Sequence, residues 1–490
     1  MTVWLWECFD VCLDGGRFEI SDPGPVIEPV REISIRRLNN GELELTTVSS
    51  RHAPVDDNNV PGSIRILTEQ IGFTGQGRYG RYEAIAQAIH CRSKSNDRDL
   101  AGGPRHTARY YVGQILITRP SPPPVAFTID WLNNVDRESC HWLGGSINDR
   151  CDITETRTIG EGVSSITLKG SGAGGQDNGY PAALEMVIGG VRLFLCASRE
   201  GPKDRWPGYI LYEGAPDDEF RQKVREVLGF TLGSGLVWLG STALDGDSQF
   251  VWTSARSASP FGRAWVEAAD PPAPLSQRME GAFEQDAVGR IASALFDHYD
   301  ELDFRVLSWN YWFAVNAPGH MAAGHFGAAI EALERAYREA HPDFNPTGPI
   351  KDAELSGEIA KALMSCVNDL KLDEPVKQQL RTKVGEINRP SGPSARKQLM
   401  ERLDLGWGAA ENTAWKRRDV AAHGKVRHRD DSIPTARDTV VLRTILNRMV
   451  LRIAGASPTY IDRSTPGHKV RALSQPIDVD STNIASGTES

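Results

Sequence analysis

Long apolar segments are missing from this sequence. No uninterrupted apolar run approaches the roughly 18 residues that a membrane-spanning helix needs. The opening stretch MTVWLWE lacks the basic region followed by an apolar stretch that marks a secretory signal. These absences argue against secretion and membrane insertion, and we expect a cytoplasmic protein with no membrane partner.

Cysteine is scarce, with seven residues in a chain of 490. Their odd number and scattered positions suit reduced thiols in a cytosol rather than a disulfide framework. Cys140, His141 and Cys151 could supply three soft metal ligands, but the sequence has no paired CxxC spacing of the zinc type. Small buried thiols are the better interpretation, and we predict neither a metal site nor another cofactor.

The chain also lacks an excess of positive charge. Its net charge of -9 argues against a protein coated in nucleic acid, because phosphate binding needs local Lys and Arg. Hydrophobic residues make up 40% and charged residues 24%, as in water-soluble globular proteins. The length exceeds what one hydrophobic core usually supports, so we expect two domains or three.

The first 270 residues alternate short β-rich runs with Gly, Pro, Asn and Asp. Runs such as 42–48 and 110–117 predict strands of a mainly antiparallel domain. Gly189-Gly190, between two apolar runs, predicts a two-residue hairpin turn. One helix is expected at about 217–229, where three acidic residues would complement a helix N-terminus. We therefore assign residues 1–270 to a β-rich N-terminal domain.

A glycine-rich segment inside this region fits the GxGxxG pattern of dinucleotide-binding loops. It spans residues 170–175 and follows a plausible strand at 165–169. A dinucleotide loop must open a helix whose N-terminus holds the pyrophosphate, whereas the next segment here looks like a strand. A flexible loop is therefore the better interpretation.

Beyond three prolines in residues 270–275, where we place the domain boundary, the apolar periodicity becomes helical. Amphipathic helices are predicted at 279–302, 306–340, 353–372, 374–387, 395–405, 411–423 and 435–454. Residues 276–458 thus form an all-α domain, and the fold class is α+β with several domains. Residues 459–490 are rich in Ser, Thr, Asp and Pro, which predicts a disordered tail. His320 and His325, five residues apart on the second of these helices, are interpreted as ordinary polar or cap residues.

The concentrated basic patch of the chain lies between residues 415 and 429. Its cations are Lys416, Arg417, Arg418, Lys425, Arg427 and Arg429. Such a patch suits contact with an RNA phosphate backbone. The ordinary alternative is a solvated helix end whose cations complement the helix dipole.

Two residue types within the patch suggest chemistry as well as binding. His423 precedes Gly424 in a plausible helix C-cap, and a histidine has an unperturbed pKa near 6.5, suited to proton exchange at neutral pH. Arg418 presents a permanent planar fork for phosphate oxygens. Cleaving RNA without a metal needs proton transfer at the ribose 2′-OH and the leaving 5′-oxygen, and a cation on the phosphate.

Helix geometry indicates that one chain holds only part of this site. Five residues at about 100° each place Arg418 and His423 roughly 140° apart around an ideal helix. Two such helices facing each other across a twofold axis would enclose a cleft with two Arg and two His. We therefore expect a homodimer with a composite site.

These residues carry a resemblance to a known family. The run from Arg418 to His423 resembles the Arg, four to six residues, His signature of HEPN ribonucleases. The wider pattern is similar to the ApeA-like HEPN group of bacterial anti-phage proteins. Residues 326–333 resemble its first-helix segment, residues 387–403 its middle connection and the helix from Thr435 its last helix. The resemblance covers about residues 300–456, and the β-rich part has the general look of the family's sensor-like domain.

The resemblance implies a role for each matching residue. Arg418 would bind the scissile phosphate, His423 would transfer protons and Asp419 would orient them. Glu331 would be a fourth member of the site, although an ordinary surface salt-bridge residue explains it equally well. Asp419 stands where the family more often has Asn, which leaves the orientation of the histidine open.

The implied function is a metal-independent HEPN endoribonuclease that acts in anti-phage defence by abortive infection. It would cleave RNA, with tRNA as a candidate, and leave a 2′,3′-cyclic phosphate and a 5′-OH. The β-rich domain would act as a sensor or regulator, with a phage-derived trigger as its partner. Two alternatives remain open: a catalytically silent HEPN protein that binds nucleotide or RNA, and a scaffold whose basic helix end docks an acidic protein.

Overall fold

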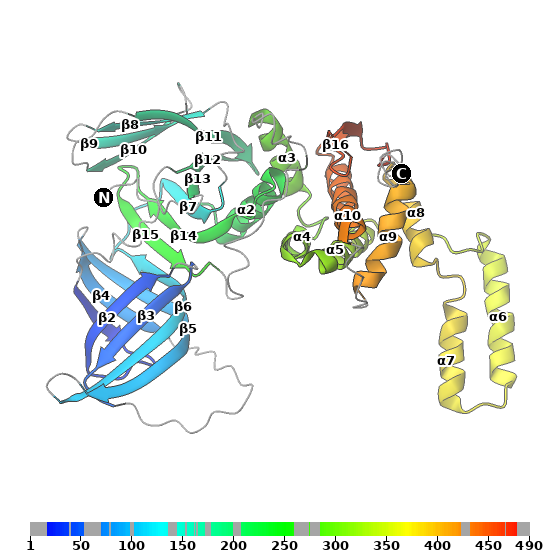
Figure 1. The fold of residues 1–490 in the computed structure, drawn as a ribbon, viewed down its shortest axis with the longest axis horizontal. Coiled ribbons are helices and arrows are strands. Elements are labelled where there is room, and N and C mark those ends of the chain that lie inside the picture. The colour runs from blue at the N-terminus through cyan, green and yellow to red at the C-terminus, as the bar shows by residue number, and fades with distance from the viewer. Residues whose placement is uncertain are drawn as a thin grey trace, which may run out of the picture. The chain divides into compact units, whose positions relative to one another are not determined.

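The computed structural model describes the chain in segments. They are residues 17–38, 41–52, 70–77, 80–98, 102–135, 145–151, 154–160, 162, 165–171, 178–198, 207–258, 274, 285–422, 432–465 and 467–477. Two compact units are present, residues 1–296 and residues 297–490, and each is described by itself. The first is mainly antiparallel β and the second mainly helical (Figure 1), which confirms an α+β protein.

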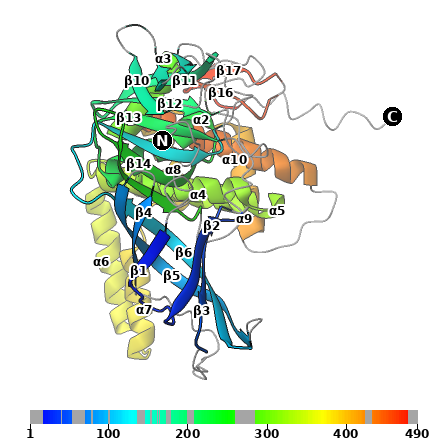
Figure 2. The ribbon, with the colours of Figure 1, turned by 90° about the vertical axis from the view of Figure 1, so that its left-hand side faces the viewer.

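Fifteen strands of the described chain form one sheet in the first unit. They are β1 (Arg17–Asp22), β2 (Val30–Arg37), β3 (Leu43–Ser49), β4 (Ile71–Gly77), β5 (Gly80–Arg98), β6 (Pro104–Thr118), β7 (Phe127–Asn133), β8 (Gly145–Cys151), β9 (Thr154–Ile159), β10 (Ile166–Ser171), β11 (Asn178–Ile188), β12 (Val191–Ala197), β13 (Gly208–Glu213), β14 (Val237–Leu244) and β15 (Phe250–Arg256). The order is β1-β4-β5-β6-β15-β14-β7-β13-β12-β11-β8-β9-β10, with β2 joined through β3 to β6. Figure 2 shows β2, β3, β5 and β6 leaving the rest of the sheet as a strongly bent layer.

Alternating side chains explain this bent layer. Along β6, buried and less buried residues alternate, as expected for a strand with one face on a core. The buried face includes Tyr110, Val112 and Ile115, which pack with Leu43 and Phe73 of neighbouring strands. Burial of large apolar side chains, at roughly 1.5–3 kcal/mol each, stabilises the layer.

Local signals at two places were predictive. Gly189 and Gly190 join β11 to β12 with φ values of 54° and 79°, which confirms the tight hairpin. The expected helix is α2 (Asp218–Leu232). Asp217 caps its first turn by accepting from the Phe220 amide, and Gly233 ends it in the left-handed conformation.

The helix α3 (Gln285–Asp297) packs on the β-rich unit. The Ser293 hydroxyl donates to the Val187 carbonyl at 2.8 Å, and the Phe296 ring lies 5.0 Å from the Phe220 ring. We expected a helix at 279–302 to open the helical domain. In the structure the division between the units falls after Phe296, beyond the proline-rich segment at which we placed it.

Seven helices and a small hairpin make up the described part of the second unit. They are α4 (Phe304–Asn316), α5 (Gly319–Ala340), α6 (Ala353–Asp369), α7 (Glu374–Gly385), α8 (Gly392–Arg402), α9 (Ala409–Ala422), α10 (Ser432–Ile453), β16 (Thr459–Ile461) and β17 (Val470–Ala472). Helix α5 is central and packs against α4, α9 and α10. Its inner stripe contains Phe326, Ile330 and Leu333, all nearly inaccessible to solvent. No helix of the described chain is long and apolar enough to cross a bilayer.

The single helix predicted at 306–340 is wrong. Pro318 interrupts it, because the residue before a proline is driven out of helical conformation. Ala317 accordingly takes an extended conformation, with ψ 146°, and α5 starts afresh at Gly319.

Helices α6 and α7 form a hairpin that packs mainly on itself (Figure 1). No side chain of α7 is buried, and apolar residues such as Leu355 of α6 and Val376 of α7 remain exposed. This hairpin adds little to the core around α5.

The disordered tail predicted from residue 459 is not what the structure shows up to residue 477. Residues 459–461 pair with residues 470–472, and Tyr460, Leu473 and Ile477 are buried. The buried Arg448 of α10 donates to the Leu473 and Gln475 carbonyl oxygens at 2.9 Å each. These three apolar residues anchor the segment, although its overall composition is polar. Residues 478–490 lie outside the described chain.

Candidate functional site

Helix α9 carries the residues expected to act on RNA. In its first turn, the buried Glu411 carboxylate accepts from the Gly408 amide at 3.0 Å and from Arg448 of α10 at 3.0 Å. Helix α9 also packs on α5 and α10. These contacts fix the start and the inner face of α9, so that Arg418, further along the helix, points towards α5.

The structure brings two of the predicted site residues together. Arg418 Nη2 donates to Glu331 Oε1 of α5 at 2.6 Å. The Arg418 side chain is only 14% exposed, whereas that of Glu331 is 51% exposed. The cation is therefore largely buried between α9 and α5, whereas the carboxylate that binds it is half exposed.

A glycine on α5 allows this approach. A Cβ added at Gly327 would lie 2.6 Å from Arg418 Cδ and 3.1 Å from Nη1. Gly327 and Glu331 are four residues apart and share one face of α5. The aliphatic part of Arg418 thus lies directly on the helix backbone, one turn before the carboxylate that binds its guanidinium.

The indole of Trp415 stacks on the guanidinium of Arg418, a contact that the sequence did not predict. The Arg418 Cζ lies 3.5 Å from the centroid of the indole, and the Cζ of Arg396 on α8 lies 3.3 Å from it. Two guanidinium groups so near one ring must occupy opposite faces. The indole is therefore sandwiched between two cations, an arrangement in which each gains electrostatic attraction to the ring. The spacing of three between Trp415 and Arg418 on one helix face was the available signal.

Arg396, the second arginine that stacks on Trp415, forms a buried ion pair. Arg396 Nη2 donates to Glu334 Oε2 at 3.0 Å, and its Nε pairs with the other oxygen of the same carboxylate. Both side chains are about nine-tenths buried. Burial raises the pKa of Glu334, opposed by the hydrogen bond from Arg396. Glu331 and Glu334, one turn apart on α5, thus bind the two arginines on either side of Trp415.

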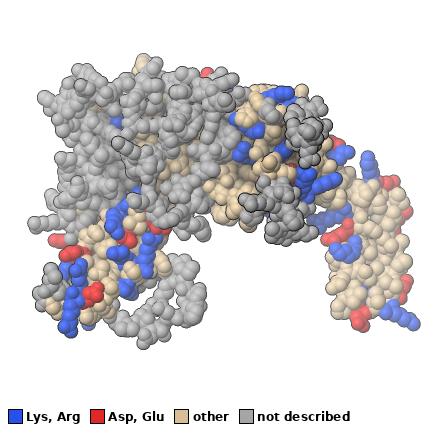
Figure 3. Space-filling model, viewed as in Figure 1, with Lys and Arg blue, Asp and Glu red and all other residues tan. Residues whose placement is uncertain are grey.

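Other predicted RNA contacts are described only in part. Lys416 is exposed, and the half-exposed Arg417 lies 3.7 Å from the buried Asp438 of α10. Asp419 lies in α9, but its side chain is outside the described part. His423, Lys425, Arg427 and Arg429 also lie outside it, and His423 directly follows the last residue of α9. Figure 3 shows Lys and Arg side chains gathered over the region of α8 to α10.

An exposed aromatic patch lies on the same helical unit. Trp309 and Phe313 of α4 are 50% and 36% exposed, with their ring centroids 4.2 Å apart. Val306 of α4 and Met321 of α5 are further exposed apolar residues of this unit. His325 of α5, interpreted from sequence as an ordinary polar or cap residue, lies with its ring 6.5 Å from that of Phe313.

The described arrangement suits phosphate recognition. Arg418 is a permanent cation with its aliphatic stem on Gly327 and its planar group on Trp415, so its fork has a defined direction. No group of three or more His, Cys, Asp or Glu in the described residues is arranged to hold a metal ion. No family model, curated protein or solved structure matches this chain.

Proposed function

We propose that the helical unit is a HEPN-type endoribonuclease that cleaves RNA without a metal ion. The observation that carries the proposal is the oriented Arg418, bound to Glu331 at 2.6 Å and stacked on Trp415. An exposed Arg at a helix end would be a flexible cation. An Arg held on three sides, five residues before His423, has the preorganisation that stabilises charge developing on a phosphate.

The reaction assigns one role to each side chain. The imidazole of His423 accepts the proton of the ribose 2′-OH, and the 2′-oxygen attacks the neighbouring phosphorus. The bond from phosphorus to the 5′-oxygen breaks, and that oxygen receives a proton from His423 of the partner subunit. The products are a 2′,3′-cyclic phosphate and a 5′-OH, and Arg418 stabilises the additional charge on the phosphate oxygens in the transition state.

Glu331 has a positioning role in this proposal. Without RNA it binds Arg418 and fixes the direction of its guanidinium. When a phosphate arrives, Arg418 would bind it through its Nη groups and retain the carboxylate contact, because a guanidinium can donate to two acceptors at once. Asp419 would orient His423.

A homodimer completes the site, and the exposed apolar patch supports this part of the proposal. Contiguous exposed apolar patches of this kind mark association surfaces. Val306, Trp309 and Phe313 are spaced on one face of α4, and Met321 of α5 is also exposed. Trp309→Ser with Phe313→Ser should give a monomer in sedimentation and abolish cleavage, whereas Leu355→Ser on α6 should do neither. A double variant that cleaves RNA normally as a monomer would contradict the composite site.

The biological setting is also a proposal. A ribonuclease of this kind would act in bacterial defence by abortive infection, with tRNA as a candidate substrate. The β-rich unit would restrain the helical unit until a phage-derived trigger is present. Expression of the active protein should then slow growth, and Arg418→Ala should remove that toxicity.

Cleavage in a chelator tests the enzyme directly. Purified full-length protein, alone and with an extract of infected cells as the source of the trigger, is incubated with total tRNA in EDTA. Arg418→Ala and His423→Ala should abolish cleavage, and Arg389→Ala, which removes an exposed cation after α7, should leave it unchanged. Cleavage that survives His423→Ala would overturn the proposal.

The second candidate function is an RNA-binding module that does not cut. The ion pair between Arg418 and Glu331 favours it, because it neutralises the cation that would otherwise activate the phosphate. In the same assay such a module would retain tRNA in an Arg418-dependent manner and leave it intact. An acidic-protein scaffold would instead show salt-sensitive protein association that is independent of RNA.

A further inference from the structure

A cavity lies between the end of α5 and the start of α8 in the helical unit. Its volume is about 630 Å³, within the roughly 300–1,000 Å³ typical of pockets that take small ligands. Its apolar wall consists of Pro342, Phe344, Pro346 and Pro390. An apolar wall with a few polar groups is the usual composition of a ligand pocket.

The charged residues that line the cavity are two arginines, and no acidic residue of the described chain lines it. Arg338 lies in the last turn of α5, and its Nε donates to the Glu334 carbonyl oxygen at 3.1 Å. Arg389, between α7 and α8, lies 3.4 Å from Glu386, but the side chains are 75% and 41% exposed, so this pair contributes little. The cavity is therefore positively charged.

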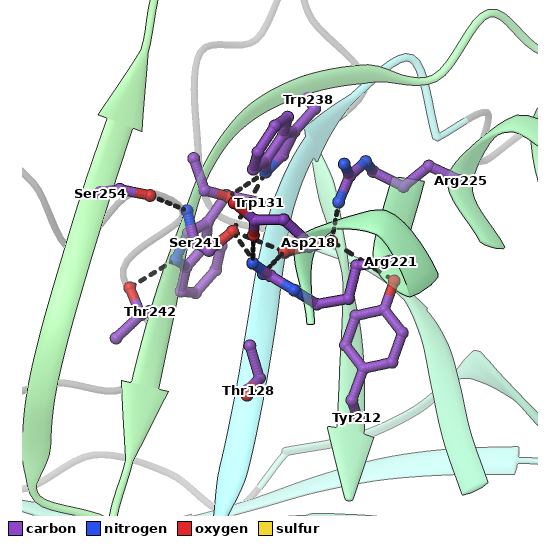
Figure 4. A network of polar contacts seen from close by, with 12 residues as sticks. Thr128, Trp131, Tyr212, Asp218, Arg221, Arg225, Trp238, Ser241, Thr242 and Ser254 are labelled. Carbon is purple, nitrogen blue, oxygen red and sulfur yellow. Dashed lines mark hydrogen bonds and ion pairs between the residues drawn. The ribbon is translucent and has the colours of Figure 1, made fainter. Parts of the chain in front are cut away.

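Buried arginines of the β-rich unit are bound differently. Arg221 and Arg225 of α2 each form an ion pair with the fully buried Asp130 (Figure 4). Such pairs connect α2 to the sheet, and the buried carboxylate offsets the charge. In the described part of the chain, no buried carboxylate forms an ion pair with Arg338 or Arg389. Their charge is thus available to a ligand in the cavity.

Phe344 gives the cavity a flat apolar surface. It is half-buried, and its ring lies 6.0 Å from that of the buried Tyr337 at 66°. The segment that carries it is clamped by Gln398 of α8, whose side-chain amide accepts from the Thr347 amide at 2.8 Å and donates to the Thr347 carbonyl oxygen at 2.9 Å. This wall is formed before a ligand binds, which lowers the entropic cost of binding.

We propose that this cavity binds a nucleoside monophosphate, with the phosphate on Arg338 and Arg389 and the base on Phe344. Guanidinium groups match the oxygens of a phosphate, and an aromatic ring can stack on any base. The first turn of α8, which also lines the cavity, adds the partial positive charge of a helix N-terminus.

The proposed site is separate from the one that would cleave RNA. Arg338 follows Glu331 by seven residues on α5, which is roughly 10 Å along the helix. Nucleotide binding at the cavity therefore does not rest on the ribonuclease proposal.

Calorimetry on the full-length protein tests the site with a nucleotide and its two halves. AMP, ribose 5-phosphate and adenosine are compared at constant ionic strength. AMP should bind, and each half should bind at least about tenfold more weakly, because each lacks one of the two contacts. Absence of AMP binding would overturn the proposal. Ribose 5-phosphate as tight as AMP would exclude stacking on Phe344, and adenosine as tight as AMP would exclude the role of the arginines.

Variants locate the binding in this cavity. Arg338→Gln and Arg389→Ala should each weaken AMP binding about tenfold. Phe344→Leu should weaken AMP binding but leave that of ribose 5-phosphate unchanged, and Lys397→Gln, which removes an exposed cation of α8, should change neither. Equal AMP binding by the wild type and the first three variants, each folded by circular dichroism, would overturn the assignment. Arg389→Ala should retain tRNA cleavage, so a failure of this site and a failure of the ribonuclease proposal are distinguishable.

Discussion

Glu331 and Glu334 offer a matched test of the candidate site. They lie one turn apart on α5 and bind the arginines on opposite faces of Trp415, but they differ in exposure. Glu331→Gln and Glu334→Gln each remove one negative charge and nearly preserve shape. Glu331→Gln should mainly slow RNA cleavage, and Glu334→Gln should mainly lower the free energy of unfolding.

The expected magnitudes follow from burial. An ion pair with one exposed partner contributes about 0.2–1 kcal/mol, so Glu331→Gln should lower the free energy of unfolding by no more than about 1 kcal/mol. Breaking a buried pair costs about 3–5 kcal/mol, because it leaves Arg396 charged and uncompensated, and Glu334→Gln should show a loss of that order. Urea unfolding measures both.

Activity should show the opposite order. If Glu331 directs Arg418 at the phosphate, losing about 1.4 kcal/mol of orientation would slow RNA cleavage about tenfold in Glu331→Gln. Cleavage per folded molecule in Glu334→Gln should change less, since Glu334 contacts Arg396 rather than Arg418. Glu331→Gln with unchanged cleavage would refute the positioning role and leave an ordinary surface salt bridge.

Three further predictions concern packing and pH. Gly327→Ala should abolish cleavage by displacing Arg418, whereas Gly357→Ala on α6, where an added Cβ meets nothing within 4 Å, should keep activity and add up to about 1 kcal/mol of helix stability. Deleting residues 459–490 should cost on the order of 5 kcal/mol in unfolding experiments, because three buried apolar anchors go with them; a fully stable deletion would support a disordered tail instead. Burial acts to raise the pKa of Glu301, but hydrogen bonds from two histidines outweigh it and hold the pKa below 4.5. Its contribution to stability should be present above pH 4.5 and lost as the pH falls below that, a loss that Glu301→Gln should abolish in urea titrations.

Short-range signals explain the parts of the fold that the sequence predicted. The acidic turn before α2 and the Gly189-Gly190 pair act through neighbouring backbone, so their structures follow from a few residues. Pro318 also acts locally, and its break in the predicted helix should have been foreseen. The anchoring of residues 459–477 depends on Arg448 and Glu411, which are distant in the sequence and become neighbours only in the folded chain.

The candidate site shows the same limit. The Arg418 and His423 spacing and the choice of Glu331 came from the sequence, and the structure brings Arg418 and Glu331 into contact. The contact between Trp415 and Arg396 could not be deduced from the sequence, because only tertiary packing brings Arg396 of α8 to the indole.

The chemistry of the RNA ends tests the central claim most directly. After incubation of tRNA with full-length protein and the trigger-containing extract in EDTA, the new 3′ ends are identified by mass spectrometry. The proposal predicts 2′,3′-cyclic phosphates with the wild type and none above background with His423→Ala. New ends bearing a 3′-OH, intact tRNA, or equal amounts of cyclic phosphate with His423→Ala would contradict it.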